Sequence, residues 1–170
     1  MSQNNSVPVF PHHGSHVDRR GMSISDNRKR ALFIGPKFTT YYYGKFSKID
    51  QNNAASGFNF GAFFFCFLWF FYRKMYVYGC LVILLMLCVG TISEYLEFQI
   101  FLFSLPIAIA LGMYANPVYK AFVEQKIRKI ESLATNNLEH ELIKRGRTSI
   151  VAACGIFVVM VLLLSFIFLA

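Results

Sequence analysis

The chain has 170 residues, of which 55% are hydrophobic and only 15% are charged, whereas soluble domains average about 45–50% and 25%. Its mean hydropathy is +0.44, and a soluble protein of this size cannot bury so much apolar surface. The composition therefore excludes an ordinary soluble domain and predicts an all-α integral membrane protein. The net charge of +8 comes from basic residues that flank apolar runs, which favours anionic lipid headgroups over nucleic acid as the partner.

The N-terminal part of the sequence is polar. Residues 1–36 lack hydrophobic periodicity, so we expect a disordered tail there. Residues 37–57 mix aromatic side chains with lysines, which is typical of a segment that lies at a membrane surface. A helical membrane domain is expected over residues 58–170.

Four stretches without charge lie within that domain. As a helix, the 15 residues of 58–72 reach only about 22 Å, less than a hydrocarbon core of about 30 Å. We therefore expect an interfacial or re-entrant helix there, and transmembrane helices over residues 75–93, 98–116 and 149–170. An alternative in which residues 58–72 form a fourth span stays open.

The distribution of basic residues predicts the orientation. Eight Lys and Arg precede residue 58 and seven lie in residues 120–147, whereas the turn at residues 94–97 has none. By the positive-inside rule the N-terminus and the basic loop face the cytoplasm and the C-terminus faces the periplasm. Apolar residues at helical spacing predict a pair of basic amphipathic helices over residues 117–146, after Asn116–Pro117 ends the preceding span.

A motif early in the apolar part resembles a known family. Residues 58–64 read FNFGAFF, residues 68–69 read LW, and residues 72–76 read YRKMY. This pattern is similar to that of small bacterial inner-membrane proteins classed as a domain of unknown function, which read F-N-W/F-x-A-F-F, L-W and Y-R-K-M-Y. The similarity extends over about residues 38–165. It implies a bacterial inner membrane and no established activity.

Two sets of residues are candidate sites. The first set would anchor the chain at the membrane interface or hold a lipid headgroup, with the arginine forking onto a phosphate; plain snorkelling of the same side chains is the alternative. These residues are Trp69, Tyr72, Arg73, Lys74 and Tyr76. The second set would cap helices or allow close helix packing. These residues are Asn59, Gly61, Ala108, Gly112, Asn116 and Gly146.

No motif for nucleotide binding, metalloprotease or serine hydrolase chemistry occurs, so we expect no catalytic residues, no metal site and no cofactor. The predicted spans lack ionisable groups at depth, which argues against a proton relay. The first functional hypothesis is a non-catalytic interaction or assembly subunit, which contacts a protein partner, a second copy or anionic lipid from the cytoplasmic face. A small oligomeric channel or transporter is the alternative. A lipid-acting enzyme remains only if Arg73 and Lys74 hold a headgroup.

Overall fold

The computed structural model describes residues 24–51, 56–95, 101–133 and 138–169. All regular structure within these ranges is helical, which confirms the all-α prediction. The elements are α1 (Ile24–Ile34), the π-helical turn η1 (Phe38–Tyr42), α2 (Tyr43–Asp50), α3 (Phe60–Tyr72), α4 (Tyr76–Tyr95), α5 (Phe101–Leu133), α6 (Leu138–Arg145) and α7 (Ile150–Leu169).

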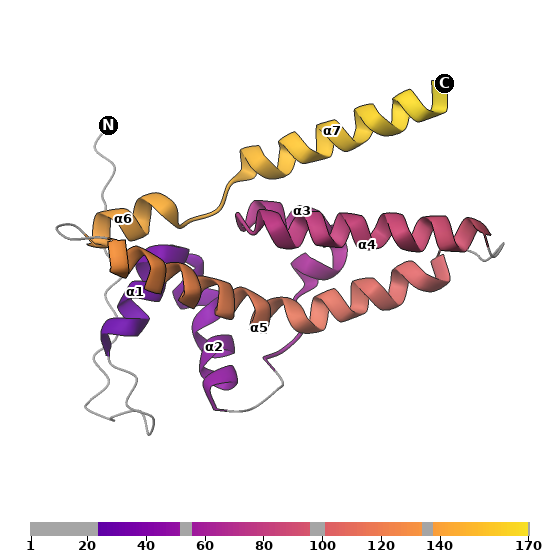
Figure 1. The fold of residues 1–170 in the computed structure, drawn as a ribbon. Helices are drawn as coiled ribbons and strands as arrows, with labels where there is room; N and C mark the ends of the chain where they lie inside the picture. Colours follow the sequence, from indigo (N-terminus) through magenta and orange to yellow (C-terminus); the bar gives the residue numbers. More distant parts are fainter. Residues whose placement is uncertain (1–23, 52–55, 96–100, 134–137, 170) are drawn as a thin grey trace.

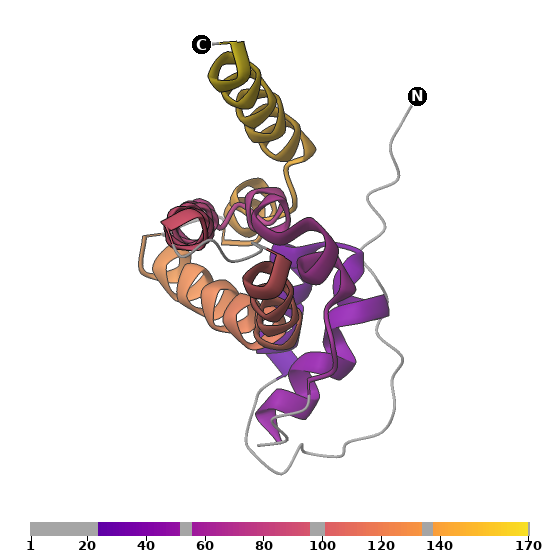
Figure 2. The same ribbon diagram turned by 90° about the vertical axis from the view of Figure 1, so that its right-hand side faces the viewer.

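The helices form two parts (Figure 1). An apolar arm consists of α4, α7 and residues 101–116 of α5, and its helices extend in one direction from the rest of the molecule. A polar platform consists of α1, η1, α2, α6 and residues 117–133 of α5. Figure 2 shows α7 standing apart from α4 and α5, and among the described elements α7 packs on α3.

Two segments are long and apolar enough to cross a membrane. One is α4, and the other is Leu138–Leu163. Residues 146–149 separate α6 from α7, so the apolar part of the second segment is α7. Few residues of either segment are buried inside the protein, unlike those of a soluble core helix. The predicted span at 98–116 begins outside the described residues, and a third span is not shown.

Helix α1 corrects the prediction of a disordered tail up to residue 36. It buries Ala31, Phe33 and Ile34 against the platform. The sequence pattern misses this helix because the surfaces that cover it belong to α5 and α6, about a hundred residues further along the chain. Residues 1–23 of the predicted tail lie outside the described residues.

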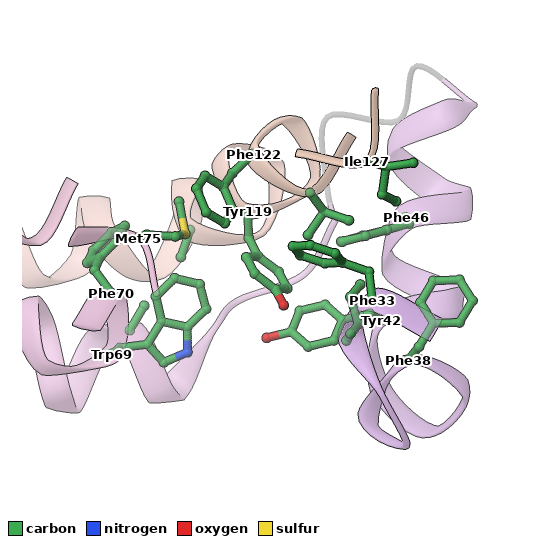
Figure 3. Packing of buried hydrophobic residues seen from close by; sticks show 14 of the residues in the cluster. Phe33, Phe38, Tyr42, Phe46, Trp69, Phe70, Met75, Tyr119, Phe122 and Ile127 are labelled. Carbon is green, nitrogen blue, oxygen red and sulfur yellow. The ribbon is translucent and has the colours of Figure 1, made fainter. Parts of the chain in front are cut away.

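The aromatic segment after α1 also differs from its prediction. Phe38, Tyr42 and Phe46 are at most 1% exposed, so they form the centre of the platform core rather than a membrane-surface anchor. Figure 3 shows Tyr42 beside Tyr119 of α5, with 5.0 Å between their ring centroids. Phe46 is 6.3 Å from Tyr119, and Phe38 packs on the far side of Phe46 at 6.2 Å. Burial inside the protein satisfies these side chains without lipid.

Four charged side chains connect α1, α2 and α5 at the edge of this core. Arg30 donates to Asp50 at 3.2 Å and also pairs with Glu124. Lys120 pairs with Asp50 and lies 3.2 Å from Glu124. The two positive and two negative charges attract one another, and this attraction offsets the cost of removing them from water.

Helix α5 runs through Asn116 and Pro117, so the prediction that these residues end a helix is wrong. Proline fits helical φ and only removes one hydrogen bond, usually with a kink, and Figure 1 shows α5 bending part-way along. The platform half of α5 has a buried face at Val123, Ile127 and Ile130. That buried face stabilises the helix beyond the proline.

The chain closes onto α1 immediately after α6, which ends at Arg145. The backbone N–H of Arg147 donates to the carbonyl of Phe33 at 2.7 Å. The Nζ of Lys74 donates to the carbonyl of Gly146 at 2.6 Å. A Cβ on Gly146 would lie 2.1 Å from the Phe33 carbonyl oxygen, so only glycine fits this contact.

We expect Gly146→Ala to lower the free energy of unfolding by about 1–3 kcal/mol, as overpacking does. The measurement is denaturant unfolding of the purified protein in mild detergent, followed by the fluorescence of Trp69. Gly44→Ala is the matched control, because Gly44 lies in α2 with nothing within 4 Å of an added Cβ. That control should raise the free energy of unfolding by about 0.5–1 kcal/mol. Equal effects of the two substitutions would contradict the contact.

Candidate functional site

Helix α3 is broken into two short limbs. Cys66 has φ 42° and ψ −119°, which interrupts the helix between Phe60 and Tyr72. The indole of Trp69 lies so close to Gly61 that a Cβ there would be 3.0 Å from its Cδ1. In a straight helix these residues would be separated by about 12 Å along the axis. The second limb therefore folds back toward the first, so that α3 forms a helical hairpin.

The first limb begins at a polar contact with α5. Asn59 is the N-cap residue, and its Oδ1 accepts from the backbone N–H of Ala62 at 3.1 Å. Its Nδ2 donates to Oδ1 of Asn116 at 2.9 Å, and Asn116 donates to the carbonyl of Gly57 at 2.8 Å. Both asparagines are buried, and each satisfies the polar atoms of the other.

The second limb ends in a Schellman motif, which reverses the chain into α4. The N–H of Met75 donates to the carbonyl of Phe70, and the N–H of Lys74 donates to that of Phe71. Lys74 takes the left-handed position with φ 59°, which is usually glycine. Met75 and Phe70 are both buried, and this geometry turns the preceding residue, Arg73, toward the platform.

Arg73 lies in a cage of aromatic rings. Its Cζ is 4.8 Å from the ring centroid of Tyr42, 5.0 Å from Tyr119, 5.4 Å from Tyr72 and 6.0 Å from Trp69. Figure 3 shows Trp69, Tyr119 and Tyr42 side by side, with the hydroxyl oxygens of both tyrosines among these rings. The cage thus joins α3 of the hairpin to η1 and α5 of the platform.

The cage leaves the charge of Arg73 incompletely satisfied. Nη2 donates to the Tyr42 hydroxyl at 2.8 Å, while Nε and Nη1 are buried without a partner. No carboxylate within the described ranges forms an ion pair with Arg73. Burial raises the pKa of both Tyr42 and Tyr119 against the opposing charge of Arg73, so these tyrosines stay neutral.

A cavity of about 670 Å³ opens beside Arg73, between α3 and α7. Lys37 also lines it, and its Nζ lies 5.5 Å from the ring centroid of Tyr72. A hydrogen bond with Thr148 and the charge of Lys37 lower the pKa of the Tyr72 hydroxyl. The remaining wall is largely apolar and includes Phe60, Leu68 and Phe157. The volume is within the range of about 300–1,000 Å³ for ligand pockets.

Residues 25–125 match a protein family that is described as "Protein of unknown function (DUF2628)". The chain belongs to the DUF2628 family. The matched region includes Arg73 with its four rings, whereas α6 and α7 lie beyond it. No curated protein and no solved structure matches the chain.

The predicted anchor residues of this DUF2628 chain lie close together, but not as surface anchors. Trp69 and Arg73 are buried at 6% and 5% exposure, and Tyr72 is half-buried. Lys74 is half-buried, and its Nζ donates to the carbonyl of Gly146. Only Tyr76 is exposed.

The predicted packing residues divide in the same way. Three of them lie at the contact between the start of α3 and α5, namely Asn59, Gly112 and Asn116. A Cβ on Gly112 would be 2.3 Å from the ring of Phe58. Gly61 lies where the two limbs of α3 pack on each other. Asn116 does not cap a helix, because α5 continues past it. Ala108 is half-buried on α5.

No pattern in the sequence identifies Lys37, Tyr42 and Tyr119 as members of the site. They are separated from Arg73 by tens of residues, so no local pattern connects them. Within the described ranges, no group of three or more His, Cys, Asp or Glu could hold a metal ion. The arrangement is suited to binding an anion beside an apolar surface.

We expect Tyr42→Phe to lower the free energy of unfolding by about 1–3 kcal/mol, the cost of a lost partner for a buried polar group. The substitution keeps the ring over Arg73 and removes only the hydroxyl that accepts from Nη2. Tyr43→Phe is the control, since Tyr43 is 49% exposed and should change stability by less than about 0.5 kcal/mol. Thermal unfolding in detergent measures both. Indistinguishable melting of the two variants would show that the hydroxyl contributes nothing.

Proposed function

We propose that this chain is a multi-pass protein of the bacterial inner membrane that acts as a non-catalytic interaction or assembly subunit. In this proposal α4, the arm half of α5 and α7 are the three spans. The polar platform lies in the cytoplasm and presents its surface to a partner. The observation that carries the proposal is that the apolar arm extends from one side of a folded, ion-paired platform (Figure 1).

The geometry of α3 supports a re-entrant hairpin in the membrane. The hairpin starts at Asn59 beside Asn116 and ends at Arg73 beside Tyr119, and these two α5 residues are only three positions apart. Each limb of about six residues is about 9 Å long, far short of a hydrocarbon core of about 30 Å. Phe64, two residues before the break at Cys66, is 71% exposed, as expected for a ring that faces lipid.

The charge of the platform supports its cytoplasmic placement and an interaction role. Arg128 and Lys129 are exposed on α5, and Lys144 is exposed on α6. None of these three side chains is needed for the platform core, which uses the opposite face of α5. Exposed basic side chains on a rigid cytoplasmic surface suit an acidic protein surface or anionic headgroups.

Cysteine labelling in intact cells tests the orientation. In a variant with Cys66, Cys80, Cys88 and Cys154 replaced by alanine, Tyr95→Cys at the end of α4 should react with a membrane-impermeant maleimide. Lys129→Cys should react only after the inner membrane is opened. The opposite pattern would overturn the cytoplasmic platform, and labelling of both before opening would overturn the membrane assignment.

The interaction role predicts a stoichiometric partner. Native mass spectrometry of the protein, extracted gently from its own membrane, should show a second polypeptide or a second copy bound. Arg128→Glu with Lys129→Glu should release that partner, because it reverses two exposed charges without touching the core. Lys48→Glu is the control, an exposed charge reversal on α2 that should leave the complex intact. A monomer with no bound polypeptide in the unmodified protein would contradict the proposal.

A further inference from the structure

We propose that the cavity between α3 and α7 binds one anionic amphiphile. Its phosphate group would lie at Arg73 and Lys37, and its acyl chain would lie along the apolar wall. This site is distinct from the exposed basic surface of α5 and α6, and it does not depend on the proposed interaction role.

The charge of the cavity favours an anion. Its lining contains two cationic side chains, Lys37 and Arg73, and no carboxylate from the described residues. Lys37 is exposed at the rim, while Arg73 is 5% exposed. An anion would therefore meet one cation on entry and a second, desolvated cation inside, where electrostatic attraction is stronger.

Arg73 also has the free donors that such a ligand requires. Nε and Nη1 are buried without a partner, although a buried charge normally has its donors satisfied. A guanidinium forms paired hydrogen bonds to phosphate or carboxylate oxygens. A phosphate oxygen would supply the acceptor that the described residues do not provide.

The apolar wall distinguishes an amphiphile from a free anion. Phe60, Phe65 and Leu68 of α3 line the cavity together with Ala153 and Phe157 of α7. A small inorganic anion would leave this surface without contact, whereas an acyl chain would cover it. The wall is built from α3 and from α7, a candidate span, so in the membrane placement proposed above, on which this step rests, lipid can reach it from the bilayer.

Trp69 provides the measurement, because it is the single tryptophan of the chain and lines the cavity. The purified full chain in a zwitterionic detergent is titrated with phosphatidylglycerol that carries bromine atoms on its acyl chains. Bromine quenches tryptophan fluorescence only at short range. We expect saturable quenching at a stoichiometry of one, and much weaker quenching with brominated phosphatidylcholine.

Substitutions separate the two parts of the site. Lys37→Gln should weaken the phosphatidylglycerol affinity by about fivefold, the effect of one basic residue near an anionic group. The control Lys48→Gln removes an exposed lysine that does not line the cavity, and it should have no effect. Ala153→Phe should abolish saturable quenching by filling the apolar part, whereas Val158→Phe, on the same helix but outside the lining, should not. Arg73→Gln should remove the preference for the anionic lipid, and Ala153→Phe keeps the test decisive if Arg73→Gln fails to fold.

Three outcomes would overturn the proposal. Equal quenching by both brominated lipids, unchanged by Lys37→Gln, would show unselective lipid filling between helices. Complete competition by millimolar inorganic phosphate, with no effect of Ala153→Phe, would show a site for a free anion. Absence of saturable quenching in the unmodified protein would show that the cavity holds no lipid. None of these results bears on the partner complex, which is measured with Arg128 and Lys129 variants, so the two proposals can fail separately.

Discussion

The packing of the buried Arg73 guanidinium among four aromatic rings is the interaction on which the junction of the α3 hairpin and the platform depends. Removing such a charge from water costs several kcal/mol, and each cation–π contact returns about 2 kcal/mol when desolvated. The rings come from η1, α3 and α5, so the charge is satisfied only when hairpin and platform are docked together. With two donor atoms left without a partner, the rings offset the charge without completing its hydrogen bonds, and an anion remains favourable.

The position of Arg73 follows from how α3 begins and ends. Asn59 satisfies the first turn and binds Asn116, which fixes the start of the hairpin on α5. The Schellman motif at Lys74 fixes its end and directs α4 away along the arm. The intervening 13 residues return to nearly the same level of α5 because the helix breaks at Cys66. An unbroken helix would carry Arg73 about 20 Å away and leave its charge without the rings of the platform.

The sequence predicts those parts of the fold that depend on local pattern. Apolar length identifies α4 and α7, and helical spacing identifies the buried face of α5 beyond Pro117. Composition alone predicts neither helix α1 nor the burial of Phe38, Tyr42 and Phe46, because the surfaces that bury them come from distant segments. The candidate site is predicted only in part: Trp69, Tyr72 and Arg73 are found from their motif, but Tyr42 and Tyr119 are 31 and 46 positions from Arg73. Nothing local indicates that they meet.

The attachment of α7 links the cavity to the platform. The helix is fixed at its start, where Ser149 donates to the carbonyl of Tyr72 at 2.9 Å and Lys74 donates to Gly146 at 2.6 Å. Beyond this point α7 packs on α3, and most of its other residues are exposed. In the lipid site proposed above, an acyl chain between α3 and Phe157 would add contacts on one face of α7. Because Gly146 also packs on Phe33 of α1, the point at which α7 is attached is itself part of the platform.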